Sequence, residues 1–328
     1  MRASESRRSI GSTGHHRGDW GELCSEDAKE NKRALEQGAR IFSSYRVGDG
    51  KVWIITEADR SATTVLLQEA YQTSKEGRLG GRLSFCTVRG RFVGQMATTN
   101  LEVLAYSDSP IGAICLRRRE LLASPGTIVT EITVEHMLLM SSYHTDSERA
   151  LSSRALERHG GNEGLSVMVG GLGLGYTAQE VLKSPAVTRV EVVEFLPQVI
   201  GWMKNGLVPL SDELNSEPRF SIVEGDVYSI LAAPPEQRYD LILIDVDHSP
   251  DETLADANAF FYTEAGLEAA KRHLKPSGLL GVWSYADSGP FATALRAVFP
   301  HAEIEPCAFD NALTGTHETN WLFLALND

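Results

Sequence analysis

The stretch "SVMVGGLGLGYT", Ser166–Thr177, decides the fold, because it joins a short apolar run to a glycine-rich turn, with four glycines in twelve residues. The residues "LSVMVG" predict a buried strand, and "TAQEVLKS", which follows the glycines, predicts a helix. In open α/β sheets, a glycine turn between the first strand and the first helix is where ligands bind. The stretch therefore predicts the start of an α/β nucleotide-binding type of fold.

The alternation of strands and helices continues to the C-terminus. It predicts right-handed βαβ units and a parallel sheet covered on both faces, that is, a doubly wound, Rossmann-like α/β fold of the class I methyltransferase type. The last two predicted strands, 302–309 and 321–326, have no helix between them, so we expect an antiparallel hairpin at the sheet edge. Four further strands are predicted at 187–195, 219–226, 239–247 and 279–285.

The N-terminal part has a different texture. Residues 1–26 are rich in Arg, Ser and Gly and predict a disordered tail. Residues 27–158 predict a smaller, mostly-β region that opens with a short helix, and 159–328 form the Rossmann-like nucleoside-binding catalytic domain. Within the β region, "EHMLLMSS" (135–142) and "SERALSSRALERHG" (147–160) are both predicted to be helical.

Composition excludes several function classes. The 328 residues carry a formal charge of −13, which is unsuited to binding nucleic acid through clustered Lys and Arg. No apolar run is long enough to span a bilayer, and the N-terminus lacks the apolar core of a secretory signal, so we expect a cytoplasmic protein that binds no membrane. The four cysteines are scattered without metal-ligand spacing, which predicts no metal site.

The spacing of the glycines narrows the class of ligand that the turn is expected to bind. Gly171, Gly173 and Gly175 form GxGxG, and Tyr176 stands where the dinucleotide fingerprint GxGxxG needs its third glycine. This pattern disfavours a pyrophosphate and is typical of sites for S-adenosylmethionine or its decarboxylated relative. By itself the motif is weak, and a glycine turn with a purely structural role is the alternative.

Acidic residues at the next strand ends favour the binding interpretation. Glu194 ends the second predicted strand, where a carboxylate can accept hydrogen bonds from both ribose hydroxyls. Asp226 follows the third strand, where it can accept from the adenine amino group. The turn and the two acids together predict an adenosyl sulfonium ligand.

The fourth predicted strand leads into "DVDHSP" (245–250), and the acids of this segment indicate the type of reaction. Ionised carboxylates at the end of a buried strand are costly unless they bind something. Attack of an amine on a sulfonium carbon needs in-line positioning and a base for the ammonium proton. We expect Asp245 to be that base and to orient a cationic substrate, with Asp247 or His248 able to share either role.

From about Leu101 onward the chain resembles the spermidine synthase, or polyamine aminopropyltransferase, family. The segments that carry the resemblance are "VMVGGLGLG", "VEVVEFLPQVI", "VEGDVYSIL", "YDLILIDVDHSP" and "FYTEAGLEAAKRHLKPSGLLGVWS". The resemblance implies transfer of an aminopropyl group from decarboxylated S-adenosylmethionine to a small amine. It implies that Glu194 holds the ribose, Asp226 with Val227 the adenine, and that Asp245 is the base. It also implies a homodimer, because the family's small β-domain commonly mediates association.

The departures from the family concern amine recognition. Gly173 replaces the acid of the usual GGGDGG loop, which contacts the aminopropyl amine, and the YHE-type segment reads Val134-Glu135-His136. The second acid of the catalytic loop is displaced, and the YPSG-like polyamine loop is missing. Two alternatives therefore stay open: an S-adenosylmethionine-dependent methyltransferase on the same fold, and a non-catalytic adenosyl-ligand-binding protein.

Overall fold

The computed structural model divides the chain into two compact units, Met1–Thr99 and Asn100–Asp328. Most of the predicted tail, and the stretch that precedes Leu101, lie outside the described residues. The structure describes residues 20, 23, 29, 31–34, 39, 41–47, 50–56, 63–67, 101–121, 124–135, 137–311 and 316–327.

The first unit contains an antiparallel sheet in the order β1-β2-β3. Its strands are β1 (Ile41–Val47), β2 (Gly50–Thr56) and β3 (Thr63–Leu67). Of the short helix predicted from residue 27, residues 31–34 are helical. Asn31 fixes this turn to β1, because its side chain donates to the carbonyl of Phe42 and accepts from the Phe42 amide.

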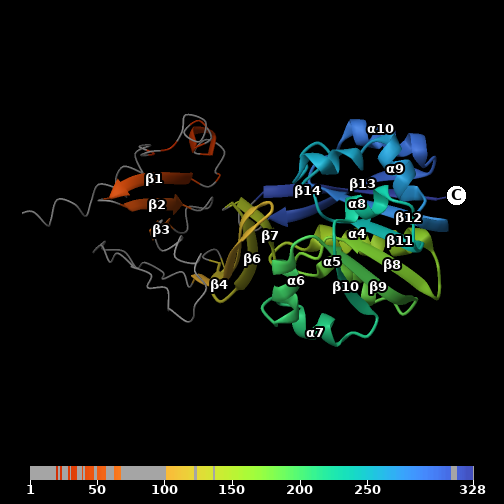
Figure 1. The fold of residues 1–328 in the computed structure, drawn as a ribbon, viewed down its shortest axis with the longest axis horizontal. Coiled ribbons are helices and arrows are strands. Elements are labelled where there is room, and N and C mark those ends of the chain that lie inside the picture. Colours follow the sequence, from red (N-terminus) through yellow and green to blue (C-terminus); the bar gives the residue numbers. More distant parts are fainter. Residues whose placement is uncertain are drawn as a thin grey trace, which may run out of the picture. The chain divides into compact units, whose positions relative to one another are not determined.

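The second unit is built on a seven-stranded sheet in the order β10-β9-β8-β11-β12-β14-β13 (Figure 1). The first five strands in this order are parallel, and the last two form an antiparallel hairpin at the edge. The doubly wound fold and its edge hairpin are thereby confirmed. The strands are β8 (Leu165–Gly170), β9 (Val187–Glu194), β10 (Phe220–Glu224), β11 (Tyr239–Ile244), β12 (Leu274–Ser284), β13 (Ala302–Asn311) and β14 (Thr316–Leu326).

Helices cover both faces of this sheet, which is why its central strands β8 and β11 are almost continuously apolar. In β11, Leu241 and Leu243 point into one core, whereas Ile242 and Ile244 point into the other. The first core includes residues of α4, α5 and α6, and the second includes residues of α8, α9 and α10. The helices are α4 (Asp146–His159), α5 (Tyr176–Leu182), α6 (Pro197–Lys204), α7 (Ser211–Ser216), α8 (Val227–Ala232), α9 (Glu264–Lys271), α10 (Gly289–Val298) and the 3-10 helix η2 (Asp256–Phe260).

A separate four-stranded antiparallel sheet precedes the large one in the chain, and it corrects one prediction. Its order is β4-β5-β6-β7, with β4 (Leu101–Ser109), β5 (Gly112–Glu120), β6 (Ile128–Val134) and β7 (Met137–Ser141). The helix predicted for "EHMLLMSS" is wrong, since this segment forms β7 and pairs with β6. Four consecutive apolar residues are too few to separate a helical period from a strand.

Helix α4 belongs to the packing of the large sheet. It lies against α5 and β12, although it was expected to close the N-terminal region. The side chain of Ser152 on α4 donates to the carbonyl of Thr177 on α5, at 2.8 Å. The compact C-terminal unit therefore begins at Asn100, well before the predicted division between residues 158 and 159.

Candidate active site

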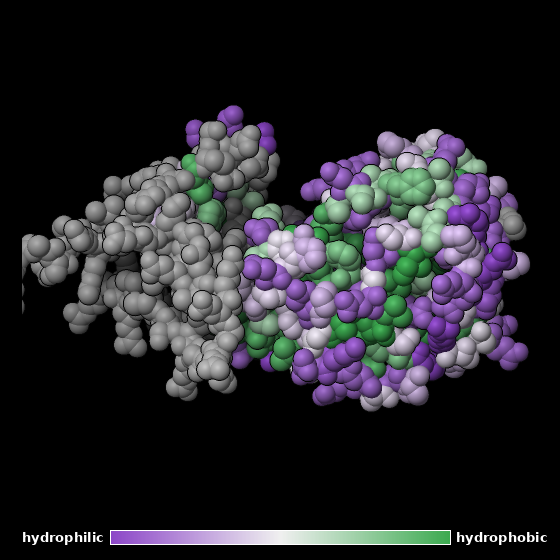
Figure 2. Space-filling model, in the orientation of Figure 1, coloured by the Kyte–Doolittle hydropathy of each residue, from purple (hydrophilic) through white to green (hydrophobic). Residues whose placement is uncertain are grey.

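A cavity of about 300 Å³ opens at the carboxyl ends of β8, β9, β10 and β11. This is the size of a small-molecule site, and it lies where ligands bind in open α/β sheets. Figure 2 shows hydrophobic side chains gathered in the middle of the C-terminal unit and bordered by hydrophilic ones. All predicted site residues except Gly175 line the cavity: Gly171, Gly173, Glu194, Asp226, Val227, Asp245 and Asp247.

The glycine loop is held close to the neighbouring strand end. Gly171 has φ +91°, and a Cβ there would stand 2.2 Å from the carbonyl oxygen of Asp245. Gly175 has φ +94° and precedes α5, and a Cβ there would meet Leu214 at 2.6 Å. The absence of a side chain at Gly175 thus lets Leu214 pack against the loop. At Gly171 it lets the loop pass close to the backbone of Asp245, which follows β11.

Gly173 faces a side chain from the other sheet. A Cβ at this position would lie 2.4 Å from the sulfur of Met140 on β7. The same sulfur accepts a hydrogen bond from the Leu174 amide at 3.0 Å. Met140 therefore occupies the space into which a larger residue at position 173 would project.

Glu194 is fixed by the backbone. Only 7% of its surface is exposed, and its two carboxylate oxygens accept from the amides of Leu172 and Leu196, each at 2.8 Å. Burial raises the pKa of Glu194, and these amides oppose the increase. The carboxylate is thus oriented in advance at the wall of the cavity.

Asp226 is also fixed, as the N-cap of α8. Its carboxylate accepts from the Tyr228 amide at 3.0 Å and from the Ser229 hydroxyl at 2.6 Å. Capping side chains of this kind satisfy helix N–H groups that have no partner within the helix. Asp226 and the adjacent buried Val227 therefore form a rigid edge of the cavity.

Asp247 is surrounded by protein donors. It accepts from the hydroxyls of Tyr228 and Tyr262 at 2.7 and 2.9 Å, and from the Leu254 amide and the Asn258 side chain at 2.6 and 2.8 Å. Four bonds fill the accepting capacity of a carboxylate. Asp247, which is 2% exposed, therefore anchors the loop after β11 to the fold, and its geometry suits this structural role better than a role as a base.

The same loop is held from the next strand. The Tyr285 amide donates to the carbonyl of His248 at 2.9 Å, and the Tyr285 hydroxyl donates to Glu252 at 2.6 Å. The side chains of His248, Leu254 and Asn258 line the cavity. The loop thus forms one wall of the cavity, and Asp247 anchors the loop close to the end of β11.

Asp245 has few partners and faces another acid. Its side chain accepts from the Thr177 hydroxyl at 2.6 Å, and burial raises its pKa to about 6. Glu148, from the first turn of α4, lines the same cavity and accepts from the Ser147 hydroxyl at 3.0 Å. Burial and the neighbouring charge of Asp245 raise the pKa of Glu148 to about 7. Two acids whose pKa values lie near neutrality form a proton-accepting pair.

Sequence reasoning missed Glu148. It assigned the family's YHE-type segment to Val134, Glu135 and His136, but Glu135 lies in the turn between β6 and β7 and accepts from the Ala113 amide. His136 lies outside the described residues. An acid in the first turn of the helix that precedes the glycine-loop strand was the signal that could have indicated Glu148.

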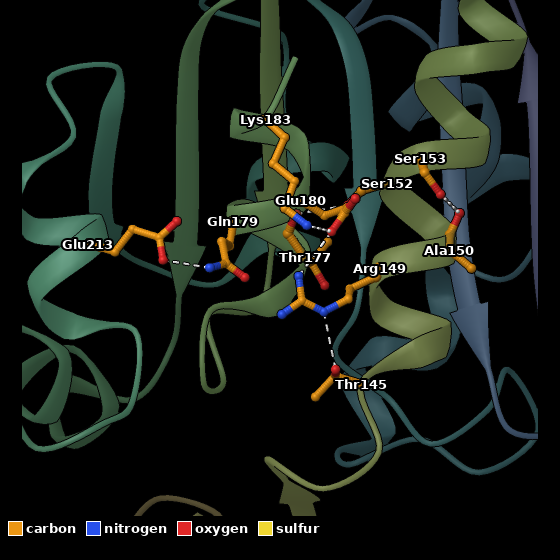
Figure 3. A network of polar contacts seen from close by, with 10 residues as sticks. All are labelled: Thr145, Arg149, Ala150, Ser152, Ser153, Thr177, Gln179, Glu180, Lys183 and Glu213. Carbon is orange, nitrogen blue, oxygen red and sulfur yellow. Dashed lines mark hydrogen bonds and ion pairs between the residues drawn. The ribbon is translucent and has the colours of Figure 1, made fainter. Parts of the chain in front are cut away.

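Polar contacts hold α4 against α5 (Figure 3). Arg149 pairs with Glu180 on α5 at 2.9 Å and donates to the Thr145 hydroxyl at 3.2 Å. The Ser147 hydroxyl, which contacts Glu148, accepts from Asn320 on β14 at 2.9 Å. These contacts fix the first turn of α4, which carries Glu148, against β14 and against α5, the helix that follows the glycine loop.

None of the described helices combines the length and apolarity that crossing a bilayer requires. In the described part of the chain, no three His, Cys, Asp or Glu side chains are grouped so that they could hold a metal ion.

Comparison with protein families gives a match that begins at Glu148. The family model described as "Spermine/spermidine synthase domain" matches residues 148–284, which run from the start of α4 to the end of β12. Residues 148–284 are thus similar to a spermine/spermidine synthase domain. This span includes the glycine loop, Glu194, Asp226 and Asp245.

Two kinds of transferase are among the curated proteins that the chain resembles. The chain is 31% identical to polyamine aminopropyltransferase 2 of Streptomyces coelicolor over 40% of its own length and 23% of that enzyme. It is 26% identical to putrescine N-methyltransferase 2 of Nicotiana attenuata over 35% of its own length and 29% of that enzyme. The chain thus spans less than a third of these curated relatives.

Solved structures show the same fold. A spermidine synthase in complex with the transition-state analogue AdoDATO is 20% identical, with a TM-score of 0.55 over 69% of this chain and 74% of that one. The spermidine synthase from Thermotoga maritima gives a TM-score of 0.54 and 21% identity over 69% of this chain and 73% of that one. The fold thus extends beyond the matched domain.

Proposed function

We propose that the chain is a transferase that moves an aminopropyl group from decarboxylated S-adenosylmethionine to a small amine. One observation carries the proposal: Glu194, Asp226 and Asp245 lie around one cavity with the glycine loop between them. Acids at or just beyond the ends of β9, β10 and β11 meet there because these strands run parallel in one sheet, with β8 between β9 and β11. The polyamine aminopropyltransferases among the curated relatives support this choice of reaction.

The proposed nucleoside end uses the carboxylates that the backbone orients. Glu194 would accept from the ribose hydroxyls, since its oxygens are already fixed by Leu172 and Leu196. Asp226 would accept from the adenine amino group, with Val227 packing against the ring. The backbone at Gly171 and Gly173 would lie against the ligand's sulfur-bearing side chain.

The proposed reaction proceeds at Asp245. The acceptor's ammonium gives one proton to the Asp245 carboxylate, and the freed nitrogen lone pair forms a bond to the carbon attached to the sulfonium. The carbon–sulfur bond breaks, and its electron pair stays on sulfur, which leaves neutral methylthioadenosine. Burial favours the neutral form of Asp245, which makes it a stronger base than an exposed carboxylate.

A second candidate is methyl transfer from intact S-adenosylmethionine. The observation that favours it is the contact of Met140 with Gly173, which fills the space where the family carries the acid that binds the aminopropyl amine. Putrescine N-methyltransferases are also among the curated relatives. In this reaction Asp245 would have the same role, and the released nucleoside would be S-adenosylhomocysteine.

We further propose a cytoplasmic enzyme whose partners are its two small-molecule substrates, with neither nucleic acid nor a membrane among them. The formal charge of −13 supports the exclusion of nucleic acid. Attack on a sulfonium carbon needs positioning and a base, so the proposal includes no metal. A homodimer follows from the family resemblance alone.

The test is to incubate the purified chain with each donor and a panel of small amines, and to separate the products by chromatography. Methylthioadenosine formed from the decarboxylated donor supports aminopropyl transfer, whereas S-adenosylhomocysteine formed from the intact donor supports the second candidate. Release of neither nucleoside by the folded protein contradicts both and favours a non-catalytic ligand-binding protein. Asp245→Asn serves as the inactive control.

A further inference from the structure

The carboxylates around the cavity fall into two groups. Glu194, Asp226 and Asp247 each accept two or more hydrogen bonds from the protein. Glu148 and Asp245 each accept one from a neighbouring hydroxyl, that of Ser147 and Thr177 respectively. Among the described lining residues, this pair is the part of the cavity wall whose negative charge the protein leaves largely uncompensated.

A single ammonium group matches the pair. It has three N–H donors and one positive charge, so it can bond to both carboxylates and offset their repulsion. The repulsion is real in this cavity, since the charge of Asp245 contributes to the raised pKa of Glu148. Both acids stand beside the glycine loop, where the sulfonium carbon would lie.

The wall beyond the pair is apolar. It is formed by side chains of the smaller sheet and of β12: Ile111, Ile132, Leu139, Met140 and Trp283. The indole N–H of Trp283 is buried and has no acceptor within the described part of the chain. An N–H group is a donor and cannot bind an ammonium, so these five side chains offer no strong acceptor to a second cation.

We propose that the acceptor is an amine with one cationic nitrogen, held between Glu148 and Asp245, and an apolar remainder that lies against the wall of Met140 and Trp283. The inference rests on the proposed function and names its substrate class: a monoamine in preference to a diamine or polyamine. A second ammonium against this wall would be buried without a partner, which is costly. The inference concerns the acceptor nitrogen, which is the attacking atom whether the transferred group is aminopropyl or methyl.

The experiment compares two acceptors of equal length, butylamine and putrescine, which differ by one terminal ammonium. With the donor that supports turnover, we expect kcat/KM for butylamine to exceed that for putrescine at least tenfold. Glu148→Gln should lower kcat/KM for butylamine by tenfold or more. Glu157→Gln is the matched control, because Glu157 is exposed on the same helix α4 and should leave both acceptors unchanged.

Calorimetry separates failure of this inference from failure of the proposed function. Each amine is titrated into the protein saturated with methylthioadenosine, and tighter binding of butylamine supports the inference even without turnover. Equal or better use of putrescine, in binding or in turnover, overturns the inference and leaves the transferase proposal in place. If methylthioadenosine does not bind and no nucleoside is released, the proposed function fails and the inference fails with it.

Discussion

The two ends of the cavity hold their carboxylates in opposite ways. At the proposed nucleoside end, Glu194 and Asp226 accept backbone N–H groups and are fixed before any ligand arrives. At the proposed reaction end, Glu148 and Asp245 are partly buried, each accepts from one hydroxyl, and their pKa values are raised. The protein therefore orients the carboxylates at one end of the cavity and raises the proton affinity of the carboxylates at the other end.

Asp245 and Asp247 show the same contrast two residues apart. Asp247 receives four hydrogen bonds and secures the loop, whereas Asp245 receives one and faces the cavity. The number of donors around a buried carboxylate thus distinguishes an anchoring acid from a reactive one, although both follow the same strand. The predictions below address this contrast.

The largest expected effect is that of Asp245→Asn on turnover. The amide cannot accept the ammonium proton, so we expect kcat to fall by roughly 10²–10⁴-fold, the usual contribution of a general base. Binding of methylthioadenosine should be nearly unchanged, since Glu194 and Asp226 remain. Rates and calorimetric titrations of the two proteins measure this, and near-full activity of the variant would show that another residue is the base.

Asp247→Ala should act on stability. The substitution leaves the hydroxyls of Tyr228 and Tyr262 and the amide of Asn258 without their acceptor, so we expect a loss of about 3 kcal/mol in the free energy of unfolding. Chemical denaturation measures this loss. A variant as stable as the parent would contradict the anchoring role, and Asp251→Ala, at an exposed position of the same loop, is the control.

Glu194→Ala should weaken nucleoside binding by about 1–3 kcal/mol, because the ribose hydroxyls lose their acceptor. Calorimetric titration with methylthioadenosine measures the change. Glu191, on the same strand, provides a control variant, Glu191→Ala, outside the cavity lining. Equal affinity in the Glu194 variant would argue against the proposed ribose contact.

Glu148→Gln should have a smaller, pH-dependent effect on stability. The folded protein raises the pKa of Glu148 from 4.5 to about 7, so between these values it binds more protons than the unfolded chain, and stability falls as pH rises. At pH 8 the charged Glu148 faces Asp245, and its replacement by a neutral amide should raise the free energy of unfolding by about 1 kcal/mol.

At pH 5 Glu148 is protonated and neutral in the folded protein, so the variant and the parent should have equal stability. Denaturation curves at pH 5 and pH 8 test this difference. A variant that is equally stable as the parent at both pH values would show that the two carboxylates do not repel each other in the folded protein.

The sequence predicted which acids line the cavity beside the glycine loop, because these residues follow parallel strands directly. Glu194, Asp226 and Asp245 each stand at or just beyond a strand end, and the topology of an α/β sheet brings such positions together. The strand–helix alternation likewise sufficed for the large sheet and its edge hairpin. The run at 135–142 failed because pairing with β6, which sequence periodicity does not contain, decided its structure.

The reaction end was less accessible to sequence reasoning, because its residues come from elements with no fixed spacing to the glycine loop. Glu148 lies on the helix before β8, and Met140 comes from the smaller sheet. The role of Asp247 depends on donors from Tyr228, Asn258 and Tyr262, which only the folded chain assembles. The sequence predicted a functional acid at position 247, but the hydrogen-bond partners of Asp247 in the folded chain determine its role.

The most direct test of the central claim is a crystal structure of the protein with methylthioadenosine. The account predicts the ribose hydroxyls on the Glu194 carboxylate, the adenine edge at Asp226 and Val227, and the thioether between the glycine loop and Asp245. A nucleoside bound elsewhere, or bound in the cavity with its ribose away from Glu194, would contradict the account.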